Sequence, residues 1–213
     1  MHQTRKNMPK TWPLLKKGTK YIIANPNEKC LPLVILLRDI LKVATKRKEA
    51  KRMIITGKIK VNNKVIKEDN YPLSLYDTVS VGDKNYKIIL GLNKKFGVEE
   101  TKDIEYKIVK IIGKRILNKD GVQINFSDGR NCIVKINEGK KINIGDSAII
   151  NLKDSKIKEI LELKEGQKTL VIGGKHLGKK GIIKSFDKES KMVVINTKDG
   201  KLNIKSNYII VEK

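Results

Sequence analysis

The sequence predicts a mostly β protein of the α+β class. Two observations support this prediction. Apolar residues recur at helical spacing between residues 33 and 54 and not elsewhere over a comparable length. From residue 58 onward, short apolar runs alternate with turn pairs such as Asn62-Asn63 and Asp128-Gly129. We therefore expect several small units in series, and we place them at residues 1–29, 30–92, 93–163 and 164–213.

Residues 1–29 are predicted to form a basic, extended arm without its own core. Pro9, Pro13 and Pro26 interrupt the segment, and each biases the residue before it toward extended geometry. A strand-like piece is expected at residues 21–24. Trp12 leaves two interpretations open, packing on the next unit or stacking on a base. The candidate polyanion-binding residues of the arm are Arg5, Lys6, Lys10, Trp12, Lys16 and Lys17.

Residues 30–56 predict two helices. Pro32 suits the first helical position, and apolar residues recur from Leu33 to Ala44 at i, i+3, i+4, i+7, i+8 and i+11. Thr45 is the expected cap of a second helix over residues 46–56, which Gly57 ends. A charged face that is merely solvated usually mixes signs, whereas the second helix has a single acid. The candidate basic residues are Arg38, Lys42, Arg47, Lys48, Lys51 and Arg52.

Strand patterns follow the helices. We expect a hairpin of residues 58–61 and 64–66 around Asn62-Asn63, because asparagine tolerates a positive φ. One strand is predicted over residues 73–81 and another over residues 86–89. The candidate contacts on the hairpin are Lys58, Lys60 and Lys64.

Residues 93–163 are predicted to form a small β barrel or sandwich. The expected strands cover residues 104–117, 122–126, 131–136, 148–152 and 157–163, with turns between them. The Asp128-Gly129 turn is more typical of a structural element than of a contact site. Arg130 is the side chain there that could reach a phosphate.

The last unit, residues 164–213, contains a loop in which glycines and lysines alternate. Glycine allows a backbone to approach a phosphate closely, and lysine supplies charge. The order of residues does not match a P-loop or a dinucleotide fingerprint. His176 has no paired acid or nucleophile nearby in sequence, which argues against catalysis. The candidate contacts are Lys175, His176, Lys179 and Lys180.

The charge of the chain points to a polyanionic partner. Lys and Arg total 47 against 23 Asp and Glu, a net charge of +24. Residues 1–60 hold 16 basic and 3 acidic side chains. Codon bias in an AT-rich genome explains 41 Lys against 6 Arg, but it does not explain base over acid. Nucleic acid is favoured over a membrane, because the longest apolar run, residues 31–37, is far shorter than the roughly 20 residues of a membrane span.

Cysteine and histidine are too few for a metal or disulfide framework. Cys30 and Cys132 are far apart in sequence, with His2 and His176 as the other potential zinc ligands. We expect no metal, no cofactor and no disulfide, and hence a reducing compartment. The N-terminus lacks the apolar stretch of a signal peptide, so export is not expected.

Several segments resemble one known family. Residues 30–39, residues 60–65, Tyr71-Pro72 and residues 76–81 resemble the small-subunit ribosomal protein family S4e of archaea and eukaryotes, as does Pro9-Lys10-Thr11-Trp12. The resemblance implies an RNA-binding domain of the S4 type in residues 30–92. Residues 171–183 resemble a KOW motif, which implies an SH3-like β barrel at the C-terminus.

The resemblance also implies a function. It predicts a structural constituent of the small ribosomal subunit, located in the cytoplasm, with ribosomal RNA and neighbouring ribosomal proteins as partners and with no membrane or small-molecule substrate. A KOW-containing transcription or RNA-associated factor outside the ribosome is the alternative. An RNA-modifying enzyme with an S4-type domain would need an α/β catalytic domain, and after residue 90 the sequence offers short strands instead.

Overall fold

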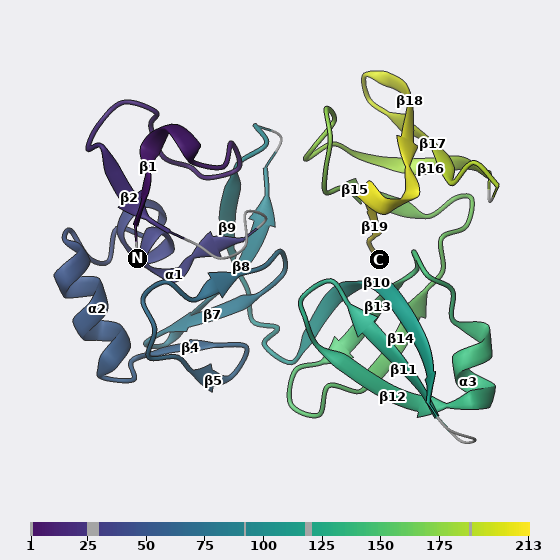
Figure 1. Cartoon of the computed structure of the whole chain (residues 1–213), viewed down its shortest axis with the longest axis horizontal. Coiled ribbons are helices and arrows are strands. Elements are labelled where there is room, and N and C mark those ends of the chain that lie inside the picture. The colour runs from purple at the N-terminus through teal and green to yellow at the C-terminus, as the bar shows by residue number, and fades with distance from the viewer. Residues whose placement is uncertain (1, 25–29, 92, 118–120, 188) are drawn as a thin grey trace. The chain divides into compact units, whose positions relative to one another are not determined.

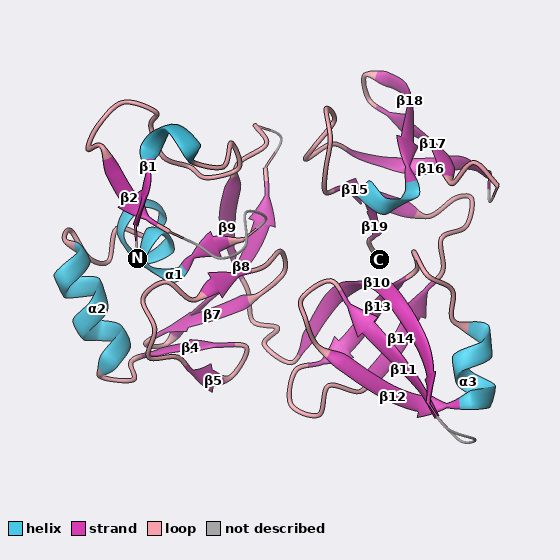
Figure 2. Ribbon diagram, in the orientation of Figure 1, coloured by secondary structure: helices cyan, strands magenta, loops and turns pink. Residues whose placement is uncertain are grey.

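The chain divides into two compact units, Met1–Ile104 and Glu105–Lys213. The computed structural model describes residues 2–24, 30–91, 93–117, 121–187 and 189–213 (Figure 1). Strands dominate both units and helices are short, so the predicted mostly β class is confirmed (Figure 2). Three predictions fall on residues outside the described ones: the arm boundary at residue 29, the boundary at residue 92, and the turn between the strands expected over residues 104–117 and 122–126.

The N-terminal segment is folded, and the prediction of an arm without a core was wrong. Strand β1 (His2–Thr4) pairs antiparallel with β2 (Tyr21–Ile23), and a 3-10 turn, η1 (Arg5–Asn7), follows β1. Trp12 is 1% exposed, and its Nε1 donates a hydrogen bond of 2.9 Å to the carbonyl oxygen of Cys30. The backbone N–H of Phe96 donates to the carbonyl oxygen of Thr11 at 2.8 Å. The segment therefore packs on the rest of its unit, as burial of a large indole requires.

The first helix is shorter than its apolar pattern predicts. A two-residue strand, β3 (Leu31–Pro32), pairs with β6 (Pro72–Leu73) and leads into α1 (Leu33–Ile35), which continues as a π-helical turn, η2 (Leu36–Ile40). Lys42 then has a φ of 54°, which no helix continues through. Ala44 is buried as predicted, but it lies in the connection to the next helix.

Helix α2 (Arg47–Ile55) forms where predicted, with a different cap. The Thr45 side chain does not accept a bond from the first turn. Instead, one carboxylate oxygen of Glu49 accepts hydrogen bonds from the Thr45 N–H and hydroxyl and from the Lys46 N–H, at 3.0, 2.9 and 3.2 Å. This is the arrangement of a capping box, in which an acid at the third helical position accepts a hydrogen bond from the backbone N–H of the cap residue.

One five-stranded antiparallel sheet completes the first unit, in the order β5-β4-β7-β8-β9. Its strands are β4 (Ile59–Val61), β5 (Lys64–Val65), β7 (Thr78–Val81), β8 (Lys84–Leu90) and β9 (Phe96–Glu100). The strand predicted over residues 73–81 is divided, because Tyr76 has a φ of 63° between β6 and β7. Strand β9 pairs with β8, so it belongs to the first unit, whereas the predicted boundary at residue 92 assigns it to the central domain.

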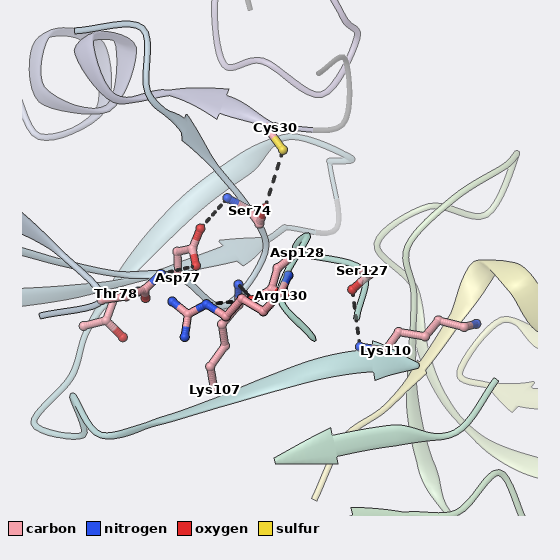
Figure 3. Close-up of polar contacts among 10 residues, drawn as sticks. Cys30, Ser74, Asp77, Thr78, Lys107, Lys110, Ser127, Asp128 and Arg130 are labelled. Atoms are coloured by element: carbon pink, nitrogen blue, oxygen red, sulfur yellow. Dashed lines mark hydrogen bonds and ion pairs between the residues drawn. The ribbon is translucent and has the colours of Figure 1, made fainter. Parts of the chain in front are cut away.

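The predicted Asn62-Asn63 turn joins β4 and β5. Both residues have positive φ, 50° and 64°, as a type I′ turn requires. The buried carboxylate of Asp77 stabilises the turn, because it accepts a bond of 2.7 Å from Asn62 Nδ2. It also accepts a bond of 2.6 Å from the Ser74 N–H (Figure 3). The hairpin is therefore fixed to β7 by side chains as well as by its ladder.

The second unit begins with a sheet in the order β12-β11-β10-β13-β14. Its strands are β10 (Tyr106–Leu117), β11 (Gly121–Phe126), β12 (Asn131–Lys135), β13 (Ser147–Asn151) and β14 (Ile157–Leu161), close to the five predicted. A helix, α3 (Ile136–Lys141), was not predicted. Gly139 lets α3 approach β11, since a β-carbon at Gly139 would press on Val122.

The second sheet of this unit has the order β18-β17-β16-β15-β19. It comprises β15 (Lys168–Val171), β16 (Lys180–Asp187), β17 (Met192–Thr197), β18 (Gly200–Lys205) and β19 (Ile209–Val211), with a 3-10 turn, η3 (Ser206–Tyr208), before β19. Its core includes Leu161 and Leu163 from the end of the first sheet. The two sheets of the second unit therefore share apolar packing.

Lys110 on β10 also joins these two sheets. Its buried Nζ donates to the carbonyl oxygens of Ser206 and Ile209, the latter at 2.6 Å. Ser147 on β13 accepts a bond of 2.9 Å from the Val211 N–H. Burial lowers the pKa of Lys110 to about 8, because desolvation disfavours the charged amine.

Candidate nucleic-acid interface

The outer face of α2 carries exposed basic residues that the sequence predicts. Ala50 and Ile54 are buried and anchor the helix, while Lys48, Lys51 and Arg52 are exposed. In the described part of the chain, none of these three side chains has an ion pair. The face is therefore positive and available to phosphates.

The acid of this helix does not neutralise that face. The pKa of Glu49 is lowered, first by the hydrogen bond from the Lys46 backbone N–H and then by those from Thr45. Its carboxylate is thus held at the start of the helix, away from the middle of the basic face.

The β4–β5 hairpin adds a second exposed basic set. Ile59 and Val61 are buried, so the alternation of β4 turns Lys60 outward. Lys58 precedes the strand and is exposed, as is Lys64 across the ladder from Val61. The three predicted residues of the hairpin therefore all face solvent.

Two predicted arginines are held by neighbouring acids. Arg38 binds Asp39 through Nε and Nη2 at 3.0 and 2.7 Å, and Arg47 binds Asp69 through the same atoms at 2.9 and 2.8 Å. Their side chains are 33% and 50% exposed. Exposed pairs of this kind contribute little to stability, but they fix the orientation of the guanidinium. Lys42 is exposed in the connection between the helices.

The N-terminal segment adds lysines to the exposed candidate residues, but its tryptophan is buried. Lys6, Lys10, Lys16 and Lys17 are exposed. Trp12 was a candidate for stacking on a base, and this prediction is corrected, since an indole that is 1% exposed offers no face to a base. The interpretation that Trp12 packs on the first unit is the one that the structure supports.

Arg5 stabilises a loop. It donates from Nε and Nη1 to the carbonyl oxygens of Thr19 and Leu15, both at 2.7 Å, and from Nη2 to the Thr19 hydroxyl at 2.9 Å.

The Asp128-Gly129 turn is built around a buried ion cluster. Lys107 Nζ lies 3.0 Å from Asp128 Oδ2, and Arg130 Nε lies 3.5 Å from the same oxygen (Figure 3). The side chains of Lys107 and Asp128 are 2% and 5% exposed, and that of Arg130 is 22% exposed. Arg130 therefore serves the turn first, in agreement with the structural interpretation. The burial of Lys107 was not predicted. Strand alternation alone does not indicate that a lysine points into the core, because that requires knowing the buried acid with which it pairs.

Two glycines of the Gly-Lys segment, Gly173 before the turn and Gly181 in β16, have a structural role that the sequence did not predict. Gly173 packs against the ring of Tyr208, and a β-carbon at Gly181 would press on the Asn196 backbone oxygen. Close packing within the chain therefore requires both glycines, without reference to a phosphate.

Two of the three lysines of this segment are paired with acids. Lys175 is exposed and His176 is partly buried. Lys179 pairs with Asp199 at 2.7 Å, a bond that lowers the pKa of Asp199, and Lys180 pairs with Glu212 at 3.1 Å. The positive charge of the loop is thus partly neutralised within the chain.

Two further features of the described residues concern membranes and metals. None of the helices they form is long and apolar enough to cross a membrane. They also contain no cluster of three or more His, Cys, Asp or Glu side chains that could hold a metal ion.

Comparison with known proteins places these features in one family. The model of the ribosomal family S4e matches residues 82–157, and the S4 domain model matches residues 31–79. The small ribosomal subunit protein eS4 of Methanocella arvoryzae is 32% identical over 221 residues, covering 99% of this chain and 93% of that protein. The protein of the same name from Methanocaldococcus jannaschii is 30% identical over 226 residues, with the same coverage.

A solved structure agrees on the fold. The crystal structure of the 30S ribosomal protein S4e from Thermoplasma acidophilum matches with a TM-score of 0.74 at 22% identity, over 87% of this chain and 95% of that chain. The structural similarity includes residues of both units, and the sequence similarity to the relatives covers nearly the whole length of the chain. The chain therefore belongs to the S4e family of small-subunit ribosomal proteins.

Proposed function

We propose that this protein is a structural constituent of the small ribosomal subunit that binds ribosomal RNA in the cytoplasm and stabilises its fold during assembly and translation. The observation that carries the proposal is the face of α2, where Lys48, Lys51 and Arg52 are exposed without an acidic partner among the described residues. A net charge of +24 would repel itself unless a polyanion were bound. Family membership supports the same role.

The mode of recognition follows from the residue types. Lysine supplies mobile point charges and arginine a rigid fork, and this chain is rich in lysine. Contacts should therefore be made mostly to the phosphate backbone, with the shape of the RNA helix rather than its base sequence being recognised. The α2 face and the β4–β5 hairpin would lie on phosphates on either side of a groove.

The remaining predicted contacts extend this surface. We assign the exposed lysines of the N-terminal segment and of the Gly-Lys loop to further RNA contacts, and we propose a KOW-type, SH3-like barrel for residues 164–213. Neighbouring ribosomal proteins are the expected partners of surfaces that lack exposed cations. We propose no catalytic role.

Sedimentation of a lysate tests the proposal. The chain, expressed from its own gene with a small C-terminal tag, should migrate with the small subunit on a sucrose gradient and stay with it after a wash at moderate salt. If the tagged chain remains at the top of the gradient while small subunits migrate, the proposal is wrong. Co-migration with RNA polymerase instead would favour the transcription-factor alternative.

A further inference from the structure

A cavity of about 470 Å³ lies within the first unit, between the N-terminal segment and the first helices. This volume is within the range of about 300–1,000 Å³ that small-molecule sites occupy. Its lining combines a cationic set with an apolar set. The residues on which the inference depends are Arg5, Arg38, Arg47, Tyr21, Ile23 and Val34.

The cationic set is unusual for this chain. Lysine outnumbers arginine by 41 to 6, yet three of the six arginines line this one cavity, and the described lining includes no carboxylate. Arginine differs from lysine in its planar fork, which suits phosphate. The three arginines of this cavity therefore have the planar geometry that a directed contact with a phosphate needs.

The three guanidinium groups are oriented before any ligand arrives. Arg38 and Arg47 use Nε and Nη2 on Asp39 and Asp69, which leaves Nη1 outside these bonds. Arg5 uses one N–H of each nitrogen on the loop of residues 15–19, and each terminal nitrogen carries a second N–H. Donors that are already fixed lose less entropy when they bind.

The apolar set suits a flat ring. Ile23 and Val34 are 8% and 1% exposed and provide a dry wall. Tyr21 is 52% exposed, and the His2 ring meets it edge-on at a centroid distance of 4.8 Å and an interplanar angle of 73°. An exposed tyrosine beside an apolar wall is the usual platform on which a nucleobase stacks.

We propose that this cavity receives a single unpaired nucleotide of the ribosomal RNA, with its base between Tyr21 and the apolar wall and its phosphate on the arginines. The inference rests on the proposed function and deepens it, because it adds a base-level contact to a surface otherwise suited to the phosphate backbone. The three arginines favour a phosphate-bearing ligand, and the buried apolar wall of Ile23 and Val34 favours a base over a free phosphate.

Photocrosslinking tests where the nucleotide lies. Benzoylphenylalanine replaces Tyr21 in the full chain, and the probe is small-subunit ribosomal RNA transcribed from the same genome. One dominant crosslinked nucleotide, unpaired in the RNA secondary structure, is the expected result. The same crosslinker placed at Tyr208, which is 43% exposed and belongs to the second unit, is the matched control and should give a different position.

A double-variant cycle then measures the contact. Replacing the crosslinked nucleotide by an abasic one should weaken binding about tenfold for the wild-type chain, as loss of one stacked base does. The same abasic replacement should hardly change the RNA affinity of the Tyr21→Ala variant, because that variant has already lost the stacking partner. The Tyr208→Ala variant should still lose affinity about tenfold, as the wild type does. Arg38→Gln should weaken binding more than Arg115→Gln, which removes an exposed arginine far from the cavity in sequence.

The outcomes separate the two proposals. If the wild-type chain does not bind the RNA, the proposed function fails. If it binds with a normal salt dependence but the crosslinks scatter, or if the abasic loss is equal in the wild type and Tyr21→Ala, the nucleotide pocket is wrong and the proposed function stands. Crosslinking in purified subunits to an acidic segment of a neighbouring protein would also overturn the pocket.

Discussion

The two units carry nearly the same net charge and use it differently. Residues 1–104 hold 23 basic and 10 acidic side chains, a net of +13, and residues 105–213 hold 24 and 13, a net of +11. In the first unit the excess is concentrated before residue 61, since residues 61–104 hold seven of each sign. In the second unit several lysines serve the fold: Lys107 and Lys110 are buried, and Lys179 and Lys180 are paired.

The comparison shows that net charge does not locate a binding surface. Lys107, which is buried in an ion pair with Asp128, counts as much toward the net charge as a lysine that is exposed on α2. We propose that the binding surface lies where basic side chains are exposed and have no acidic neighbour among the described residues, and the two uses of charge can be tested separately.

Trp12→Ala tests whether the basic N-terminal segment is an integral part of the first unit. We expect a loss of about 4 kcal/mol in the free energy of unfolding, because a large buried side chain is removed and its packing partners do not collapse into the space. Urea unfolding of the full chain measures it. In limited proteolysis, cleavage before residue 25 should be slow in the wild type and fast in the variant. Rapid cleavage of the wild type would contradict the buried position.

Lys107→Met tests the internal use of charge in the second unit. Removing one partner of a buried pair leaves Asp128 with Arg130 at the longer distance of 3.5 Å, so we expect a loss of about 3 to 4 kcal/mol. The double variant Lys107→Met with Asp128→Asn should recover part of this loss. RNA affinity measured where both proteins are folded should hardly change. A large fall in affinity with normal stability would instead place Lys107 at the RNA.

Lys110 predicts a pH dependence. The folded pKa of about 8 lies below the ordinary value of 10.5, so the unfolded chain binds more protons between these values and stability should rise with pH through that window. Relative to Lys110→Met, the wild type should gain up to about 3 kcal/mol from pH 7 to pH 10.5. Comparing the two proteins cancels other titrating groups. A constant difference across this range would show that the amine is solvated.

The triple variant Lys48, Lys51 and Arg52→Gln tests the external use of charge. Removing three phosphate contacts should flatten the salt slope by about three, so that from 50 to 200 mM salt the wild-type affinity falls about 40-fold more than that of the variant. Filter binding to the ribosomal RNA measures both slopes. The matched control is the triple variant Lys175, Lys179 and Lys180→Gln, in which two of the three lysines are paired with acids. We expect its salt slope to flatten by about one. Equal slopes for both variants would remove the distinction between the units.

Local chemistry made much of the fold predictable. The Asn62-Asn63 turn follows from the tolerance of asparagine for positive φ, and α2 follows from the spacing of Ala50 and Ile54. The exposed positions on α2 and on the hairpin follow from the same periodicities. The family resemblance was carried by short motifs, and the comparisons confirm it over nearly the whole chain.

What the sequence did not reveal depends on contacts between distant residues. The burial of Trp12 requires the Cys30 carbonyl and β9, the inward turn of Lys107 requires Asp128, and α3 requires the space that Gly139 provides against Val122. The cavity brings together Tyr21 and Arg38, which belong to different predicted domains. The pattern at Tyr21, an aromatic residue before an apolar pair in a basic segment, predicts a strand and does not indicate a cavity.

The bond between Phe96 and Thr11 has a consequence for the order in which the protein folds during its synthesis. The N-terminal segment is translated before β9, one of the elements that it contacts, which follows about 85 residues later. At roughly 5–20 residues per second, the segment waits on the order of 5–20 s before this contact can form. During that interval its lysines and its indole are exposed on the nascent chain. The segment is thus fixed in place only when β9 has been made, and until then it is open to chaperones or to stray RNA.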